Sequence, residues 1–223
     1  MSALRRPRKL LVPPPFAPRE AWTRGERALL RRLSSPARIQ EFLDGLTYRP
    51  EDRPGCPRRV LEERRANCYD GAILAAAALR ELGHPPLLLD MWAVRDDDHV
   101  IAVFRAGGRL GAVAKSNFVG LRFREPIHRT LRELVLTYFE PYFNASGEKT
   151  LRAYSPLLDL RRFDRYGWTF RDAPLQYLSD RLDALPHRRL LSPAMERRLE
   201  PVDPRSREAG MLGCLPEGLY REG

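Results

Sequence analysis

The stretch that decides the fold runs Arg65-Ala66-Asn67-Cys68-Tyr69-Asp70-Gly71-Ala72 and continues through an alanine-rich segment to Leu82. Asn67 is suited to cap a helix, because its side-chain oxygen can accept a backbone N–H of the first turn. Cys68 is then the first helical residue. Unpaired N–H groups and the helix dipole favour negative charge there, so we expect the pKa of this thiol to fall below its usual value. The pattern predicts a buried helix with a reactive cysteine at its amino end.

Three strands are predicted after this helix, over residues 87–94, 99–104 and 110–117. The first is an apolar run and the second alternates between two faces, beginning with His99. Gly107 and Gly108 separate the last two strands and indicate a hairpin. A cysteine on a helix is therefore followed by a histidine at the start of the next-but-one element.

The remaining chain is predicted to be mainly helical, over residues 19–33, 37–46, 58–65, 126–143 and 172–185. We divide the chain into a basic, proline-rich arm (1–18), a domain (19–190) whose core, with the candidate reactive cysteine, spans 60–120, and an irregular, polar C-terminal extension (191–223).

The composition limits the compartment and the partners. Three widely spaced cysteines without a C-x-x-C pair indicate a reducing compartment. No apolar run reaches the length of a membrane span or of a signal-peptide core, so we expect a cytoplasmic protein without a membrane partner. The net charge of +10 lies mostly in the first third and comes almost entirely from arginine. Nucleic acid is an unlikely partner, because no known binding motif accompanies that charge.

The order of cysteine helix, strand, histidine strand and third strand resembles the transglutaminase-like superfamily, relatives of the papain-like thiol enzymes. Two further stretches resemble a bacterial group of such proteins: Gly111-Ala112-Val113-Ala114-Lys115-Ser116-Asn117-Phe118 and Leu131-Arg132-Glu133-Leu134. The resemblance implies an α+β, cysteine-protease-like fold, with the cysteine helix packed on a small antiparallel sheet. It also implies Cys68 as nucleophile and His99 as its base.

The third catalytic residue departs from the family pattern, because the usual Asp is missing from the third strand. A three-residue hairpin loop would place Asn117 opposite His99, whereas a two-residue loop would place Ser116 there. We favour Asn117, whose amide oxygen could accept Nδ1–H of His99, as the Asn of papain-like enzymes does. The register of the hairpin decides between the two.

The expected chemistry is amide hydrolysis or acyl transfer through a thioester, on a protein, peptide or other amide substrate. Tyr69, Asp70 and Ser116 are candidate substrate-binding residues beside Cys68. Neither a cofactor nor a metal is expected, and His187 is expected at the surface. The alternatives are a scaffold that kept the fold without a working triad, and a nucleic-acid binder with one continuous arginine face.

Overall fold

The computed structural model describes residues 11–16, 21–50 and 53–220. Within them the chain forms an α+β fold on a seven-stranded, antiparallel sheet in the order β6-β5-β4-β3-β7-β9, with β8 beside β3. Its strands are β3 (Leu87–Ala93), β4 (His99–Ala106), β5 (Arg109–Val113), β6 (Arg124–His128), β7 (Leu151–Tyr154), β8 (Leu158–Asp159) and β9 (Arg188–Arg189). The three predicted strands are present as the centre of a sheet that is larger than expected.

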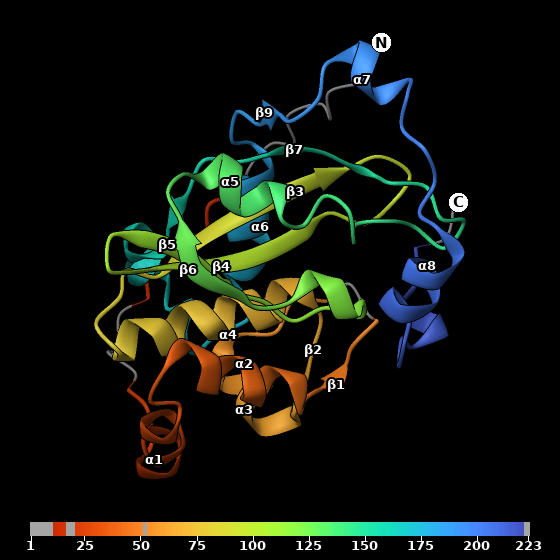
Figure 1. The fold of residues 1–223 in the computed structure, drawn as a ribbon. Coiled ribbons are helices and arrows are strands. Elements are labelled where there is room, and N and C mark those ends of the chain that lie inside the picture. Colours follow the sequence, from red (N-terminus) through yellow and green to blue (C-terminus); the bar gives the residue numbers. More distant parts are fainter. Residues whose placement is uncertain (1–10, 17–20, 51–52, 221–223) are drawn as a thin grey trace.

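Helices cover both faces of this sheet (Figure 1). One face carries α1 (Arg24–Arg32), α2 (Pro36–Asp44), α3 (Pro57–Glu63), α4 (Cys68–Glu81) and α6 (Leu175–Asp183). The other face is covered by α5 (Leu131–Leu136) and the turns that follow it, which bury Tyr138 and Tyr142. We call these the α4 face and the α5 face.

The side chains of β4 divide between the two faces because successive residues of a strand point in opposite directions. Val100, Ala102 and Phe104 belong to the hydrophobic cluster of the α4 face. Ile101 and Val103 belong to the cluster of the α5 face, and His99 shares their alternation. The candidate base therefore projects away from the layer that contains the cysteine helix.

Helix α4 begins at Cys68 as predicted, and the Asn67 side chain accepts the backbone N–H of Asp70. Its small residues let it lie tightly against the sheet. A Cβ added at Gly71 would come 2.3 Å from the Cβ of Lys115, so only glycine fits this crossing. Nζ of Lys115 in turn donates to the carbonyl oxygens of Leu43 (2.9 Å) and Leu46 (2.5 Å) near the end of α2. This contact fixes the segment after β5 against both helices.

A small parallel pair places Tyr48 near the start of α4. β1 (Thr47–Tyr48) lies beside β2 (Arg65–Ala66), with Tyr48 opposite Ala66. Because β2 ends two residues before Cys68, the pair brings the Tyr48 ring to the end of the sheet where the cysteine lies.

The prediction of a long helix over residues 126–143 is wrong. The chain instead forms the edge strand β6, then the short helix α5, and then turns. Pro126 lacks an N–H and is tolerated on an edge strand, where one side needs no partner. Thr130 accepts the N–H of Glu133 and thereby starts α5, while the Thr137 hydroxyl donates to the Leu134 carbonyl at its end.

The C-terminal part is more ordered than its composition indicates. It contains α7 (Pro193–Glu196), α8 (Pro204–Gly210) and a 3₁₀ turn, η3 (Pro216–Gly218). Figure 1 places α8 at the end of the sheet where α4 starts. Contacts of Cys214 and Leu215 with Asn117 connect this part to the segment after β5. Most of the predicted arm lies outside the described residues, and Leu11–Phe16 is irregular.

Candidate active site

Cys68 lies at the amino end of α4 with its sulfur against the first residues of β4. Its Sγ is 3.8 Å from the carbonyl oxygen of Asp98, to which the thiol donates. The residue is partly exposed. The predicted position of the cysteine is therefore confirmed.

The predicted ionisation of this thiol is wrong for the arrangement observed. Burial of the sulfur raises the pKa of Cys68 to about 12, and the nearby carboxylates Asp97, Asp70 and Asp90 raise it further. The backbone N–H of Val100 acts in the opposite direction but is outweighed. Desolvation is the largest cause of the shift, and the thiol is neutral at pH 7.

His99 is buried at the start of β4 on the α5 face. Its Nε2 lies 2.8 Å from the carbonyl oxygen of Leu121, so Nε2 carries the proton and donates. The rings of Tyr138 and Tyr142 flank the imidazole, with centroids 6.4 and 6.3 Å away. Burial lowers the pKa of His99 to about 4, although the Leu121 carbonyl opposes the shift. The imidazole is therefore neutral, and its Nδ1 is an acceptor.

Cys68 and His99 line one small cavity of about 40 Å³, together with Ser116, Asn117 and Tyr48. We call this the inner cavity. Among the described residues, no hydrogen bond joins the Cys68 sulfur to the His99 ring, since the sulfur contacts the Asp98 carbonyl and Nε2 of His99 contacts the Leu121 carbonyl. The structure brings the two residues to one cavity without pairing them.

The hairpin has a two-residue loop, with Ala106 opposite Arg109. Continued along the strands, this register places Ser116 opposite His99, although β5 itself ends at Val113. The three-residue loop that favoured Asn117 is therefore wrong. Ser116 accepts the N–H of Phe118 through its hydroxyl.

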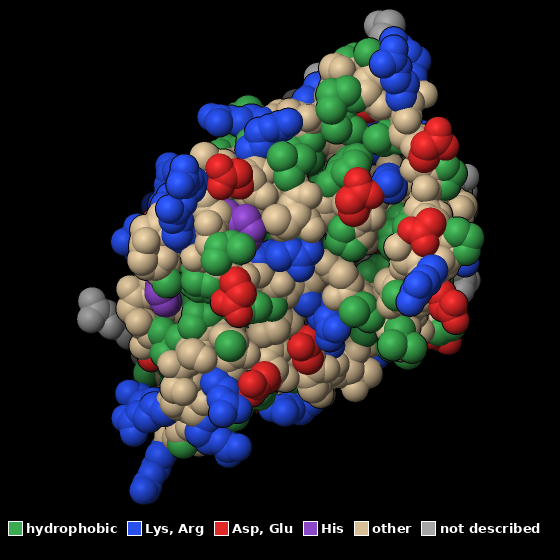
Figure 2. Space-filling model, in the orientation of Figure 1, with side chains coloured by type: hydrophobic (Ala, Val, Ile, Leu, Met, Phe, Trp, Pro, Cys, Tyr) green, Lys and Arg blue, Asp and Glu red, His purple; other side chains and the backbone are tan. Residues whose placement is uncertain are grey.

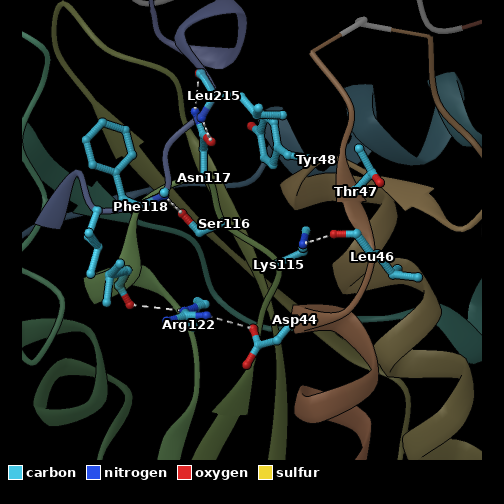
Figure 3. Close-up of a pocket in the computed structure, with 13 residues that line it drawn as sticks. Asp44, Leu46, Thr47, Tyr48, Lys115, Ser116, Asn117, Phe118, Arg122 and Leu215 are labelled. Carbon is cyan, nitrogen blue, oxygen red and sulfur yellow. Dashed lines mark hydrogen bonds and ion pairs between the residues drawn. The ribbon is translucent and has the colours of Figure 1, made fainter.

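The side chain of Asn117 is engaged by the C-terminal segment rather than by His99. Its Nδ2 donates to the carbonyl oxygen of Leu215 (2.9 Å), and its Oδ1 accepts the Leu215 N–H (2.8 Å). Both bonds are visible in Figure 3. In this arrangement Asn117 does not orient the imidazole.

The two residues that follow Cys68 differ in their surroundings. Tyr69 lines a larger opening of about 300 Å³, which we call the outer cleft and which Cys68, Asp90 and Asp183 also line. Its hydroxyl donates to the Leu175 carbonyl. Asp70 is fully buried and is held by Arg49 and by the N–H of Gly55, so its carboxylate anchors the loop before α3 instead of facing the cleft.

A second histidine lies on the α4 face, where the sequence did not place one. Nε2 of His187 is 2.8 Å from Oδ2 of Asp90, and Nδ1 is 2.8 Å from the Leu185 carbonyl oxygen. His187 is thus half-buried and paired, not a free surface residue. Burial lowers its pKa, but the Asp90 carboxylate outweighs burial and the net shift is upward. The sequence signal was an aspartate within the otherwise apolar strand β3.

The C-terminal segment lines both the outer cleft and the inner cavity. Glu217, Gly218 and Leu219 line the outer cleft, while Gly218 and Tyr220 line the inner cavity. We call residues 215–220 the covering segment. It therefore lines both openings that reach Cys68.

The described residues show neither a metal site nor a membrane span. No group of three or more His, Cys, Asp or Glu side chains among them has the arrangement to hold a metal ion. None of their helices is both long and apolar enough to cross a bilayer. On the face drawn in Figure 2, basic side chains lie mainly towards the edge with acidic ones between them, so this face lacks a continuous arginine surface.

No family model and no curated protein matches this chain.

Proposed function

We infer that the protein is a cysteine-dependent amide hydrolase or acyltransferase of transglutaminase-like type, with Cys68 as nucleophile and His99 as base. The observation that carries this proposal is the inner cavity. A cysteine at the capped start of a buried helix and a histidine at the start of β4 line it together. Their order along the chain and their elements match the family resemblance of residues 60–120.

The proposed reaction uses groups at this end of the sheet. The Cys68 sulfur attacks an amide carbonyl and its proton passes to Nδ1 of His99, whose other nitrogen already donates to Leu121. The backbone N–H of Cys68 at the start of α4 donates to the developing oxyanion. The imidazolium then protonates the leaving amine, which leaves an acyl thioester. Water or a second amine releases the acyl group and restores the thiol.

In this proposal, the arrangement with the covering segment beside Cys68 is the resting state of the enzyme. Its neutral thiol and neutral imidazole follow from burial. Moving the covering segment admits water to the inner cavity, which lowers the pKa of the thiol and raises that of the imidazole. Either Ser116 or a released Asn117 then serves as the polar partner of His99.

Two observations favour the alternative, a scaffold without a working triad. The His99 ring is fixed by Leu121 on the α5 face, and Asn117 is committed to Leu215. In that case the cysteine is a packing residue of the α4 face and turnover is absent. The test must therefore detect acyl transfer itself.

The experiment offers the full chain a pool of peptide amides together with hydroxylamine and measures hydroxamate products by mass spectrometry. Hydroxylamine intercepts a thioester whether the natural acceptor is water or an amine, so one readout covers both reactions. Cys68→Ser and His99→Gln should each abolish hydroxamate formation. Cys56→Ser is the matched control, because Cys56 is a buried cysteine that does not line the site. Hydroxamate formed by the Cys68→Ser protein contradicts the proposal. So does the absence of hydroxamate from a full chain that keeps Cys68 and in which Gly218→Val displaces the covering segment.

A further inference from the structure

We propose that the groove beside Cys68 is a binding site for a peptide turn of the form Pro-x-Gly, and that the covering segment occupies it in cis. This inference rests on the proposed function for the chemistry that follows binding, although binding itself is measurable without turnover. It assigns the ligand a backbone geometry and one obligatory small residue. It also makes the chain's own segment a competitor for substrate.

The first contact recognises the backbone. The carboxamide of Asn117 donates to the Leu215 carbonyl and accepts the Leu215 N–H (Figure 3), so both main-chain groups of one residue are bound by one side chain. Such a two-point pair is independent of the side chain carried by the bound residue. In agreement, the Leu215 side chain is partly exposed. Asn117 thus serves as a main-chain clamp.

The second feature is a tight turn that follows the clamped residue. The N–H of Gly218 donates to the Leu215 carbonyl at 3.0 Å, which closes a turn over Pro216 and Glu217. Proline at the second position of such a turn has its φ angle set in advance, so less entropy is lost when the turn is bound. Before and after the turn, Leu215 and Leu219 are extended. The ligand therefore enters and leaves the site as an extended chain.

The third feature is a slot that admits only glycine. A Cβ added at Gly218 would lie 2.7 Å from Cε1 of Tyr48 and 3.0 Å from Nδ2 of Asn117. Space rather than backbone conformation imposes this, because the positive-φ glycines of the described chain do not include Gly218. The slot lies at both openings to the cysteine, since Gly218 lines the inner cavity and the outer cleft. The selected residue is thus held beside the sulfur.

The experiment displaces the segment within the full chain and then supplies it in trans. Gly218→Val introduces the clash with Tyr48, and Gly25→Val is the matched control, because no atom lies within 4 Å of a Cβ there. A fluorescent peptide with the sequence of residues 212–220 is titrated into each protein and followed by anisotropy. A tethered segment has an effective concentration near millimolar, so the peptide should bind Gly218→Val about tenfold or more tighter than the control.

A second peptide tests the slot. With valine at the position of Gly218, binding to the Gly218→Val protein should weaken about tenfold, since the clash now lies in the ligand. In a protein whose own segment is displaced by Leu215→Pro instead, Tyr48→Ala should restore binding of the valine peptide. No binding of the glycine peptide, or equal binding of both peptides, overturns the proposal. Leu215→Pro, which removes the N–H that Asn117 accepts, displaces the segment in a second way if Gly218→Val does not fold.

The two proposals fail separately. Binding of the glycine peptide in a Cys68→Ser, Gly218→Val protein depends only on the clamp and the slot. If this binding occurs and the cysteine-containing protein forms no hydroxamate, the peptide-binding site is supported and the proposed acyl-transfer chemistry is contradicted. If hydroxamate forms but neither peptide binds, the proposed chemistry is supported and the peptide-binding site is contradicted.

Discussion

One face of the sheet holds the buried His99 and the other holds the half-buried His187, and the pKa values of the two imidazoles shift in opposite directions. His99 on the α5 face has a carbonyl and two aromatic rings around it, and its pKa falls to about 4. His187 on the α4 face is bonded to the Asp90 carboxylate, and its pKa rises. Burial alone favours the neutral ring, whereas a buried carboxylate partner reverses that preference. The comparison shows that the hydrogen-bond partner decides the direction of each shift, since His99 is bonded to a neutral carbonyl and His187 to a carboxylate.

The largest expected effect concerns His99 in acid. An unfolded chain takes up a proton near pH 6.5, while folded His99 does so only near pH 4, so the free energy of unfolding should fall as the pH drops between these values. The loss attributable to this residue is about 3 kcal/mol. Urea unfolding of the native chain and of His99→Gln at pH 7 and pH 4 measures it. Equal pH dependence in the two proteins would show that the α5-face histidine is not desolvated.

The opposite sign is expected on the α4 face. A raised pKa of His187 stabilises the folded state below pH 6.5, and this contribution disappears as the pH rises through the folded value. Asp90→Asn should therefore cost about 2 kcal/mol at pH 6 and clearly less at pH 9. Urea unfolding at the two pH values measures the difference, with Asp159→Asn as a control remote from the cysteine. A larger cost at pH 9 would reverse the assigned sign.

The smallest effect links this pair to the cysteine. Asp90 raises the pKa of Cys68, although less than burial does. Removing its charge in Asp90→Asn should speed alkylation of Cys68 by iodoacetamide about twofold at pH 8, because a larger fraction of the thiol ionises. Mass mapping of the labelled peptide gives the rate, and Asp159→Asn again serves for comparison. An unchanged alkylation rate would show that the charge of Asp90 does not affect the ionisation of Cys68.

Local patterns predicted the centre of the molecule. The Asn67 cap, the small residues of α4 and the alternation of β4 are each contained within a few neighbouring residues, and all three are present. The two-residue hairpin was not resolved in advance, because Gly107 and Gly108 fit a two-residue or a three-residue loop. That single residue of register exchanged Ser116 for Asn117 as the candidate opposite His99.

Long-range pairs could not be predicted in the same way. His187 lies 97 positions after Asp90, and Leu215 lies 98 positions after Asn117. Neither pair has a sequence pattern, because each depends on how the chain returns to the end of the sheet. The short strands β8 and β9 have only two residues each and carry no periodicity to detect. The protonation state of the Cys68 thiol could not be predicted for the same reason, because Asp90 and the covering segment lie near it only in the folded chain.

The environment of Lys115 has a consequence for self-modification. A protein that holds an acyl group on sulfur can transfer it to its own amines, and this chain has only three lysines. Lys115 is buried and bonded to two carbonyls, and burial lowers its pKa. Lys149 is paired with Glu140, and Lys9 lies outside the described residues. The arginine-rich surface thus carries positive charge in a form that does not accept acyl groups, so an acyl-enzyme of this chain would meet few amines belonging to itself or to its own copies.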